Sequence, residues 1–143
     1  MFGIICAIIS GIAMSVQGVF NTRLGEKIGV WETTLLVQII ALIVSLIVFF
    51  IWGNGSYTNL KEVNKLYLLG GILGVIITFT VISSVSSMGP TLGIGIILVA
   101  QLLTAALIDA FGLFGSEKIN FSSNHFLGIA IMIIGIIIFK YNH

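Results

Sequence analysis

Five long apolar segments constrain the fold of this chain more than any other feature of its sequence. A helix that crosses a bilayer needs roughly 20 mostly apolar residues, because the hydrocarbon core is about 30 Å thick and each residue advances a helix by about 1.5 Å. Segments that meet or approach this length are residues 2–20, 31–52, 66–88, 91–114 and 126–141. The sequence therefore predicts an all-α integral membrane protein, with five transmembrane helices in a single domain over residues 1–143.

The composition supports a membrane location. Charged residues make up 8% of the chain and hydrophobic residues 58%, whereas soluble domains carry about 25% charged residues. A chain this apolar cannot build the polar surface of a soluble protein. The formal net charge of +1 gives no reason to expect a nucleic acid partner. We expect a multi-pass protein of a bacterial cell membrane (inner or plasma), surrounded by the lipid bilayer.

The fourth segment carries the most informative polar residues, Gln101 and Asp109. In a helix they lie about 12 Å apart along the axis and within about a quarter turn of one face. Asp109 would then lie about six residues before the helix exit. An acidic side chain inside a membrane normally faces protein or a water-filled cavity. Asp109 is therefore either a functional group facing a cavity or a structural residue near the helix end, hydrated or capped.

Polar residues in the first and third segments extend this candidate site. Gln17 and Asn21 share a helix face near the end of the first segment. The third segment has six hydroxyl residues close together, Thr78, Thr80, Ser83, Ser84, Ser86 and Ser87. They either line a cavity or form a packing face whose hydroxyls bond back to helix carbonyls. The expected substrate-binding or coupling residues are Asp109, Gln101, Gln17, Asn21, Thr78 and Ser83.

Small residues and one proline predict how the helices meet. Glycines spaced four residues apart let two helices approach closely. The glycines expected to pack helices are Gly3, Gly11, Gly70, Gly74 and Gly93. Pro90, preceded by Gly89, interrupts the helix, so the third and fourth segments should form an antiparallel hairpin. The polar stretch 21–30 is expected to be the first loop.

The basic residues are divided equally between the two sides of the membrane. With five spans, the second and fourth loops lie on one side of the membrane, and they contain Lys61, Lys65 and Lys118. The other loops and the C-terminal tail lie on the opposite side, and they contain Arg23, Lys27 and Lys140. Orientation follows the Lys and Arg bias of short loops, and this count shows no bias. The chain is therefore expected to insert in both orientations and to pair as an antiparallel dimer, the arrangement of inverted-repeat transporters.

An ordered set of motifs resembles the YdcZ-like family of the drug/metabolite transporter superfamily. The set begins with Gln17-x-x-x-Asn21-x-x-Leu24 and continues with Gly70-Gly71-x-x-Gly74, Gly89 and Gly93, Gln101-Leu102, Asp109-x-Phe111-Gly112, Gly128 and Gly135. The resemblance covers essentially the whole chain. It implies a five-helix unit that acts as an antiparallel dimer with itself or with a close paralogue. It also implies transport of small metabolites or organic cations.

These patterns favour a dimeric secondary transporter or exporter of a small polar or cationic metabolite. Two alternatives remain open, an ion channel at a dual-topology dimer interface and a non-transporting membrane subunit. We see no nucleophile, metal or acid/base motif, so we expect neither an enzyme nor a bound metal or cofactor. The unknown small-molecule substrate is the expected soluble partner.

Overall fold

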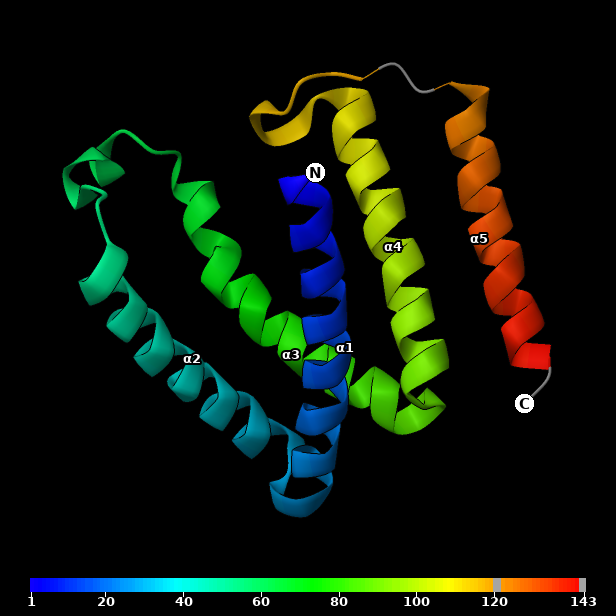
Figure 1. The fold of residues 1–143 in the computed structure, drawn as a ribbon, viewed down its shortest axis with the longest axis horizontal. Coiled ribbons are helices and arrows are strands. Elements are labelled where there is room, and N and C mark those ends of the chain that lie inside the picture. Colours follow the sequence, from blue (N-terminus) through cyan, green and yellow to red (C-terminus); the bar gives the residue numbers. More distant parts are fainter. Residues whose placement is uncertain (120–121, 142–143) are drawn as a thin grey trace. The chain divides into compact units, whose positions relative to one another are not determined.

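A computed structural model describes residues 1–119 and 122–141, and their regular structure is entirely helical (Figure 1). The long helices are α1 (Phe2–Ile28), α2 (Val30–Trp52), α3 (Gly70–Met88), α4 (Pro90–Phe111) and α5 (Ser123–Tyr141). Three short 3-10 helices connect them, η1 (Tyr57–Lys61), η2 (Lys65–Leu69) and η3 (Leu113–Gly115). Five helices of the described chain are long and apolar enough to cross a membrane. The predicted all-α, five-span architecture is confirmed.

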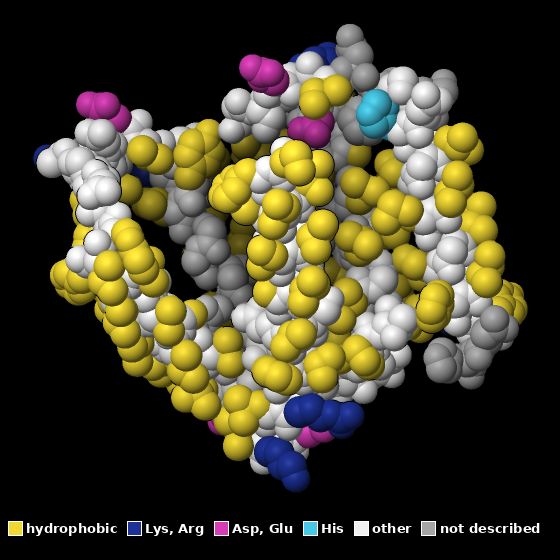
Figure 2. All heavy atoms as spheres, in the orientation of Figure 1, with side chains coloured by type: hydrophobic (Ala, Val, Ile, Leu, Met, Phe, Trp, Pro, Cys, Tyr) yellow, Lys and Arg dark blue, Asp and Glu magenta, His cyan; other side chains and the backbone are white. Residues whose placement is uncertain are grey.

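The helix surfaces are those of a protein solvated by lipid. Among the described hydrophobic residues, only Ile82 and Val85 are buried. Hydrophobic side chains follow the helices along their length, and the charged side chains lie near helix ends (Figure 2). Exposed apolar surface on this scale is stable only where hydrocarbon replaces water. The chain divides into two compact units, one of residues Met1–Ser83 and one that begins at Ser84, within α3.

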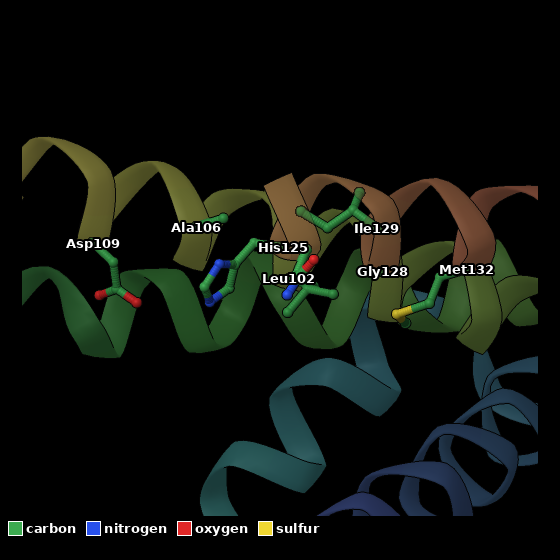
Figure 3. A pocket seen from close by; sticks show the side chains of 8 residues that line it. Leu102, Ala106, Asp109, His125, Gly128, Ile129 and Met132 are labelled. Carbon is green, nitrogen blue, oxygen red and sulfur yellow. The ribbon is translucent and has the colours of Figure 1, made fainter. Parts of the chain in front are cut away.

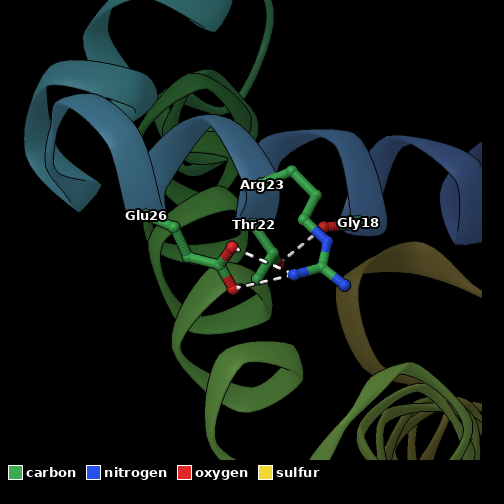
Figure 4. Close-up of polar contacts among 4 residues, drawn as sticks. All are labelled: Gly18, Thr22, Arg23 and Glu26. Carbon is green, nitrogen blue, oxygen red and sulfur yellow. Dashed lines mark hydrogen bonds and ion pairs between the residues drawn. The ribbon is translucent and has the colours of Figure 1, made fainter.

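Helix α1 is longer than the span expected for it and includes most of the predicted loop 21–30. It runs to Ile28 over 27 residues, or about 40 Å, so it extends beyond a hydrocarbon core of about 30 Å. The loop prediction was wrong because polarity does not end a helix. The residues after Phe20 include Arg, Leu, Glu and Lys, which favour helices. Arg23 also pairs with Glu26 one turn later, at 3.1 Å (Figure 4).

Gly29 alone connects α1 to α2. Its φ of 101° and ψ of 152° lie in a region that only glycine adopts readily. The Gly29 N–H donates to the Gly25 carbonyl over 3.0 Å, and its carbonyl accepts from the Thr33 N–H over 3.1 Å. The turn therefore satisfies groups at both helix ends while reversing the chain, and it holds the start of α2 against the end of α1.

Close packing in the first unit occurs where α1, α2 and α3 meet. A Cβ atom added to Gly25 would lie 3.2 Å from the Cγ2 atom of Ile82, so glycine permits this approach of α1 to α3. Ile82 and Thr33 are 1% and 0% exposed. Trp31 of α2 stacks on Phe79 of α3, with ring centroids 4.4 Å apart. Small residues and one aromatic pair thus hold the three helices together.

Gly89 forms the turn between the end of α3 and the start of α4. Its φ of 78° ends α3, and Pro90 begins α4 at a position where a missing N–H costs no hydrogen bond. A Cβ atom added to Gly93 would lie 3.1 Å from Ser84 Oγ and 3.3 Å from the Ser84 carbonyl oxygen. The expected break at Gly89 and Pro90 is confirmed, and Gly93 occupies a close helix contact.

The other glycines expected to pack helices differ in their surroundings. A Cβ atom added to Gly74 would lie 3.6 Å from Gln38 Nε2 of α2, an ordinary contact. Added at Gly3, Gly11 or Gly70, it would meet no atom of the first unit within 4 Å. The packing role of these three glycines therefore remains a prediction, and it would require a neighbour outside this unit.

We predict that Gly29→Ala destabilises the protein by about 1–3 kcal/mol, because alanine is strained at this φ. The added methyl group would also displace the Glu32 carboxylate, which lies against Gly29. Gly55→Ala is the matched control, since its Cβ would meet nothing within 4 Å. Thermal unfolding in mild detergent measures both variants. Equal unfolding midpoints would show that the turn does not need glycine.

We also predict that Gly93→Ala lowers the unfolding midpoint, because the new methyl group presses on the backbone of Ser84. Overpacking of this kind costs about 1–3 kcal/mol. Gly71→Ala, a change in α3 that meets nothing within 4 Å, should leave the midpoint unchanged or raise it, since alanine favours helix. The prediction fails if Gly93→Ala is as stable as Gly71→Ala.

Candidate functional site

The end of α4 determines the position of Asp109. We expected this helix to continue to residue 114, but it ends at Phe111 because Gly112 adopts the left-handed conformation, with φ 62° and ψ 39°. Asp109 therefore lies in the last helical turn and not about six residues inside the helix. Its backbone carbonyl accepts a hydrogen bond from the Ile119 N–H over 2.9 Å. The chain after α4 thus folds back over the helix end.

A pocket of about 400 Å³ lies between α4 and α5, and Asp109 is one of its walls (Figure 3). This volume falls within the range of small-molecule sites. Figure 3 shows Asp109 and His125 toward one end of the pocket and Met132 at the other. The lining residues are Leu102, Ala106, Asp109, Asn124, His125, Gly128, Ile129 and Met132. The pocket therefore combines a polar end, formed by an acid, an amide and an imidazole, with apolar walls.

The Asp109 carboxylate has no hydrogen bond or ion pair to another residue in the described part of the chain. Its side chain is half-buried. A helix C-terminus carries partial negative charge, which stabilises cations and disfavours an acid. The negative electrostatic potentials of the Asp109 carboxylate and of the C-terminal end of α4 therefore add inside the pocket. Such a site attracts positive charge.

His125 enters the pocket from the first turns of α5, and Ser122, the residue before this helix, bonds to its ring. The Ser122 N–H donates to His125 Nδ1 over 3.2 Å, and the Ser122 hydroxyl lies 2.9 Å from the same nitrogen. A backbone amide can only donate, so Nδ1 is the acceptor and the proton of the neutral ring is on Nε2. His125 and Asn124 were not among the site residues expected from the sequence. The available signal was that α4 and α5 are consecutive spans, so the end of one and the start of the next reach the same side of the membrane.

The other predicted site residues do not line this pocket. Gln101 is on an exposed face of α4, next to the lining residue Leu102. Gln17 and Asn21 belong to α1 in the first unit, where Gln17 is exposed and Asn21 is 8% exposed. The structure therefore brings Asp109 together with residues of α5, and it does not place Gln101 beside them.

The hydroxyl groups of α3 mostly bond to their own helix. Thr78 Oγ1 donates to the Gly74 carbonyl over 2.9 Å, and Ser83 Oγ donates to the Phe79 carbonyl over 2.9 Å. Thr80 and Ser87 make similar bonds. Thr78 also accepts from Gln38 Nε2 of α2 over 3.4 Å. For these residues the geometry favours the packing interpretation, in which each hydroxyl donates its hydrogen bond to a carbonyl of its own helix.

The first turns of α2 make polar contacts, although most of this helix is apolar. Thr34 Oγ1 donates to the Val30 carbonyl over 2.8 Å. The Thr33 hydroxyl is buried and has no hydrogen-bond partner among the described residues. In α1, the buried Thr22 donates to the Gly18 carbonyl over 2.7 Å (Figure 4). The start of α2 is therefore a protein contact, although its later turns are exposed.

Comparison with known proteins agrees with this membrane architecture. A family model described as "Putative inner membrane exporter, YdcZ" matches residues 2–138. Searches of curated proteins and of solved structures gave no match. The match covers all five membrane helices apart from the last residues of α5. It supports a role in membrane transport, and the chain belongs to the YdcZ family of multi-pass inner membrane proteins.

Proposed function

We propose that this protein exports a small organic cation and that the α4–α5 pocket binds it. One observation carries the proposal, the Asp109 carboxylate in a largely apolar pocket with no partner among the described residues. A carboxylate in an apolar membrane site is costly unless a positive charge accompanies it. A cationic substrate supplies that positive charge when it binds. When the substrate departs, the carboxylate is again without a positive partner.

The rest of the pocket supports an organic cation over a bare metal ion. A metal ion requires several protein ligands. Among the described residues, no three side chains of Asp, Glu, His or Cys are grouped so that they could hold one. Leu102, Ile129 and Met132 instead provide apolar walls. They suit a cation whose charge is attached to alkyl or aromatic groups, and Met adapts to ligands of different shape.

Transport requires that this pocket open alternately to the two sides of the membrane. We propose that two copies of the chain, inserted in opposite orientations, form the transporter. The equal basic counts of the two sides support this arrangement. The small-residue stripe of Gly3 and Gly11, open within its own unit, is proposed as part of the dimer contact. Gln101, Gln17 and Asn21 are kept as proposed substrate-contacting residues outside this pocket.

Asp109→Asn tests the proposed binding group, because it keeps the side-chain shape and removes the charge. We expect a cation such as benzyltrimethylammonium to bind at least about thirtyfold more weakly, as for the loss of one partner of a desolvated charge pair. Export from proteoliposomes should stop, while size-exclusion behaviour stays normal.

Glu117→Gln is the matched control, since it removes a carboxylate from the connection after α4, outside the pocket. It should bind and export like the unmodified protein. Normal binding by a well-folded Asp109→Asn variant would show that the pocket is not the cation site.

Dual insertion gives a second test. A reporter at the C-terminus should give signal from both sides of the membrane, because the Lys and Arg counts favour neither orientation. Adding two or three lysines to the tail should shift the C-terminus to the cytoplasm. Signal from a single side in the unmodified protein would rule out an antiparallel homodimer and would require a second chain.

A further inference from the structure

The α4–α5 pocket contains a second titratable side chain in addition to Asp109. His125 lines the same pocket, from the opposite helix. Its Nδ1 atom is an acceptor for the Ser122 N–H, so a second proton can be added to the ring only where that hydrogen bond is given up or rearranged. Histidine is the side chain whose charge ordinarily changes between about pH 5 and 8. The net charge of the two pocket residues thus depends on the state of His125.

We propose that His125 determines when the pocket accepts a cation, by carrying a positive charge that competes with the substrate for Asp109. This inference rests on the function proposed above. With a neutral imidazole, the two side chains have a net charge of −1 and a cation completes the pair. With an imidazolium, their net charge is zero, and a second cation would enter beside a like charge.

The other titratable groups described in the second unit are not part of the pocket lining. Glu117 and Lys118 belong to the connection after α4, where Lys118 packs beside Gly112. Lys140 and Tyr141 are at the far end of α5. Of the described titratable residues in this unit, only Asp109 and His125 line the pocket. A pH dependence of cation binding that disappears when His125 is replaced is therefore assigned to His125.

Competition between a proton and a cation has a defined signature. Each cation that binds displaces one proton from His125, so the apparent affinity falls by up to about tenfold per pH unit once the imidazole is charged. The same linkage means that a proton on His125 lowers cation affinity and a bound cation lowers proton affinity by equal factors. A membrane proton gradient would then favour cation release on the more acidic side.

The test measures benzyltrimethylammonium binding to the full-length protein in detergent between about pH 5.5 and 8. The charge of this probe does not change with pH. We expect the affinity to fall steeply below the pH at which His125 becomes charged. His125→Asn places an amide oxygen where Nδ1 accepts from Ser122 and cannot gain the positive charge. It should bind the probe at pH 8 and remain within about twofold of that affinity down to pH 5.5.

His125→Gln is a second replacement in case the first variant misfolds, and Glu117→Gln should keep the full pH dependence. A measurement without substitutions completes the test. Adding the probe to the unmodified protein in weak buffer should release protons at the acidic end of this range and none at pH 8.

The inference is overturned if the unmodified protein binds equally well across this range. It is also overturned if either folded His125 variant keeps the pH dependence, or if cation binding releases no proton at the acidic end of the range. These results leave the proposed cation site intact, whereas normal binding by Asp109→Asn removes that site whatever the pH profile.

Discussion

The exclusion of water from the bilayer core is the constraint on which this structure depends. Every backbone N–H and carbonyl in hydrocarbon must find a partner within the protein, and a helix satisfies them all within one segment. The side chains then need not form a large core, since lipid covers the apolar faces. This explains why Ile82 and Val85 are the only buried hydrophobic residues in the described chain. It also explains why hydroxyls such as that of Ser83 bond back to their own helix.

Glycines at the helix ends convert these separate helices into a defined arrangement. Gly29 and Gly89 each reverse the chain in one residue, at positive φ, so the end of one helix lies beside the start of the next. Gly112 ends α4 early and brings Asp109 into the last turn. Three backbone positions that only glycine adopts readily therefore control two helix contacts and the depth of the acidic residue. Small residues at the crossings, such as Gly25 and Gly93, let the backbones approach.

The pocket follows from this same geometry. The connection after α4 folds back, and the Ile119 N–H bonds to the Asp109 carbonyl. The first turns of α5 are thereby positioned beside the acidic end of α4. Asp109, His125 and Asn124 then share one pocket, although 15 positions separate the aspartate from the amide in the sequence. Apolar residues one and two turns away complete its walls. The chemistry of the site thus depends on where α4 ends and on how the chain leads from there to α5, and not on a local sequence motif.

The sequence by itself determined the class of protein, the five membrane helices and the break at Gly89, because hydropathy and the effect of proline act locally. It did not determine that α1 continues to Ile28, since a polar surface is compatible with helix and with loop alike. Nor did it identify His125, which appeared as an ordinary loop residue, or separate Gln101 from the pocket. Only the tertiary structure decided these points. Which side chains share a pocket depends on where helices end and how neighbouring helices pack, and those distances are set by contacts between residues far apart in the chain.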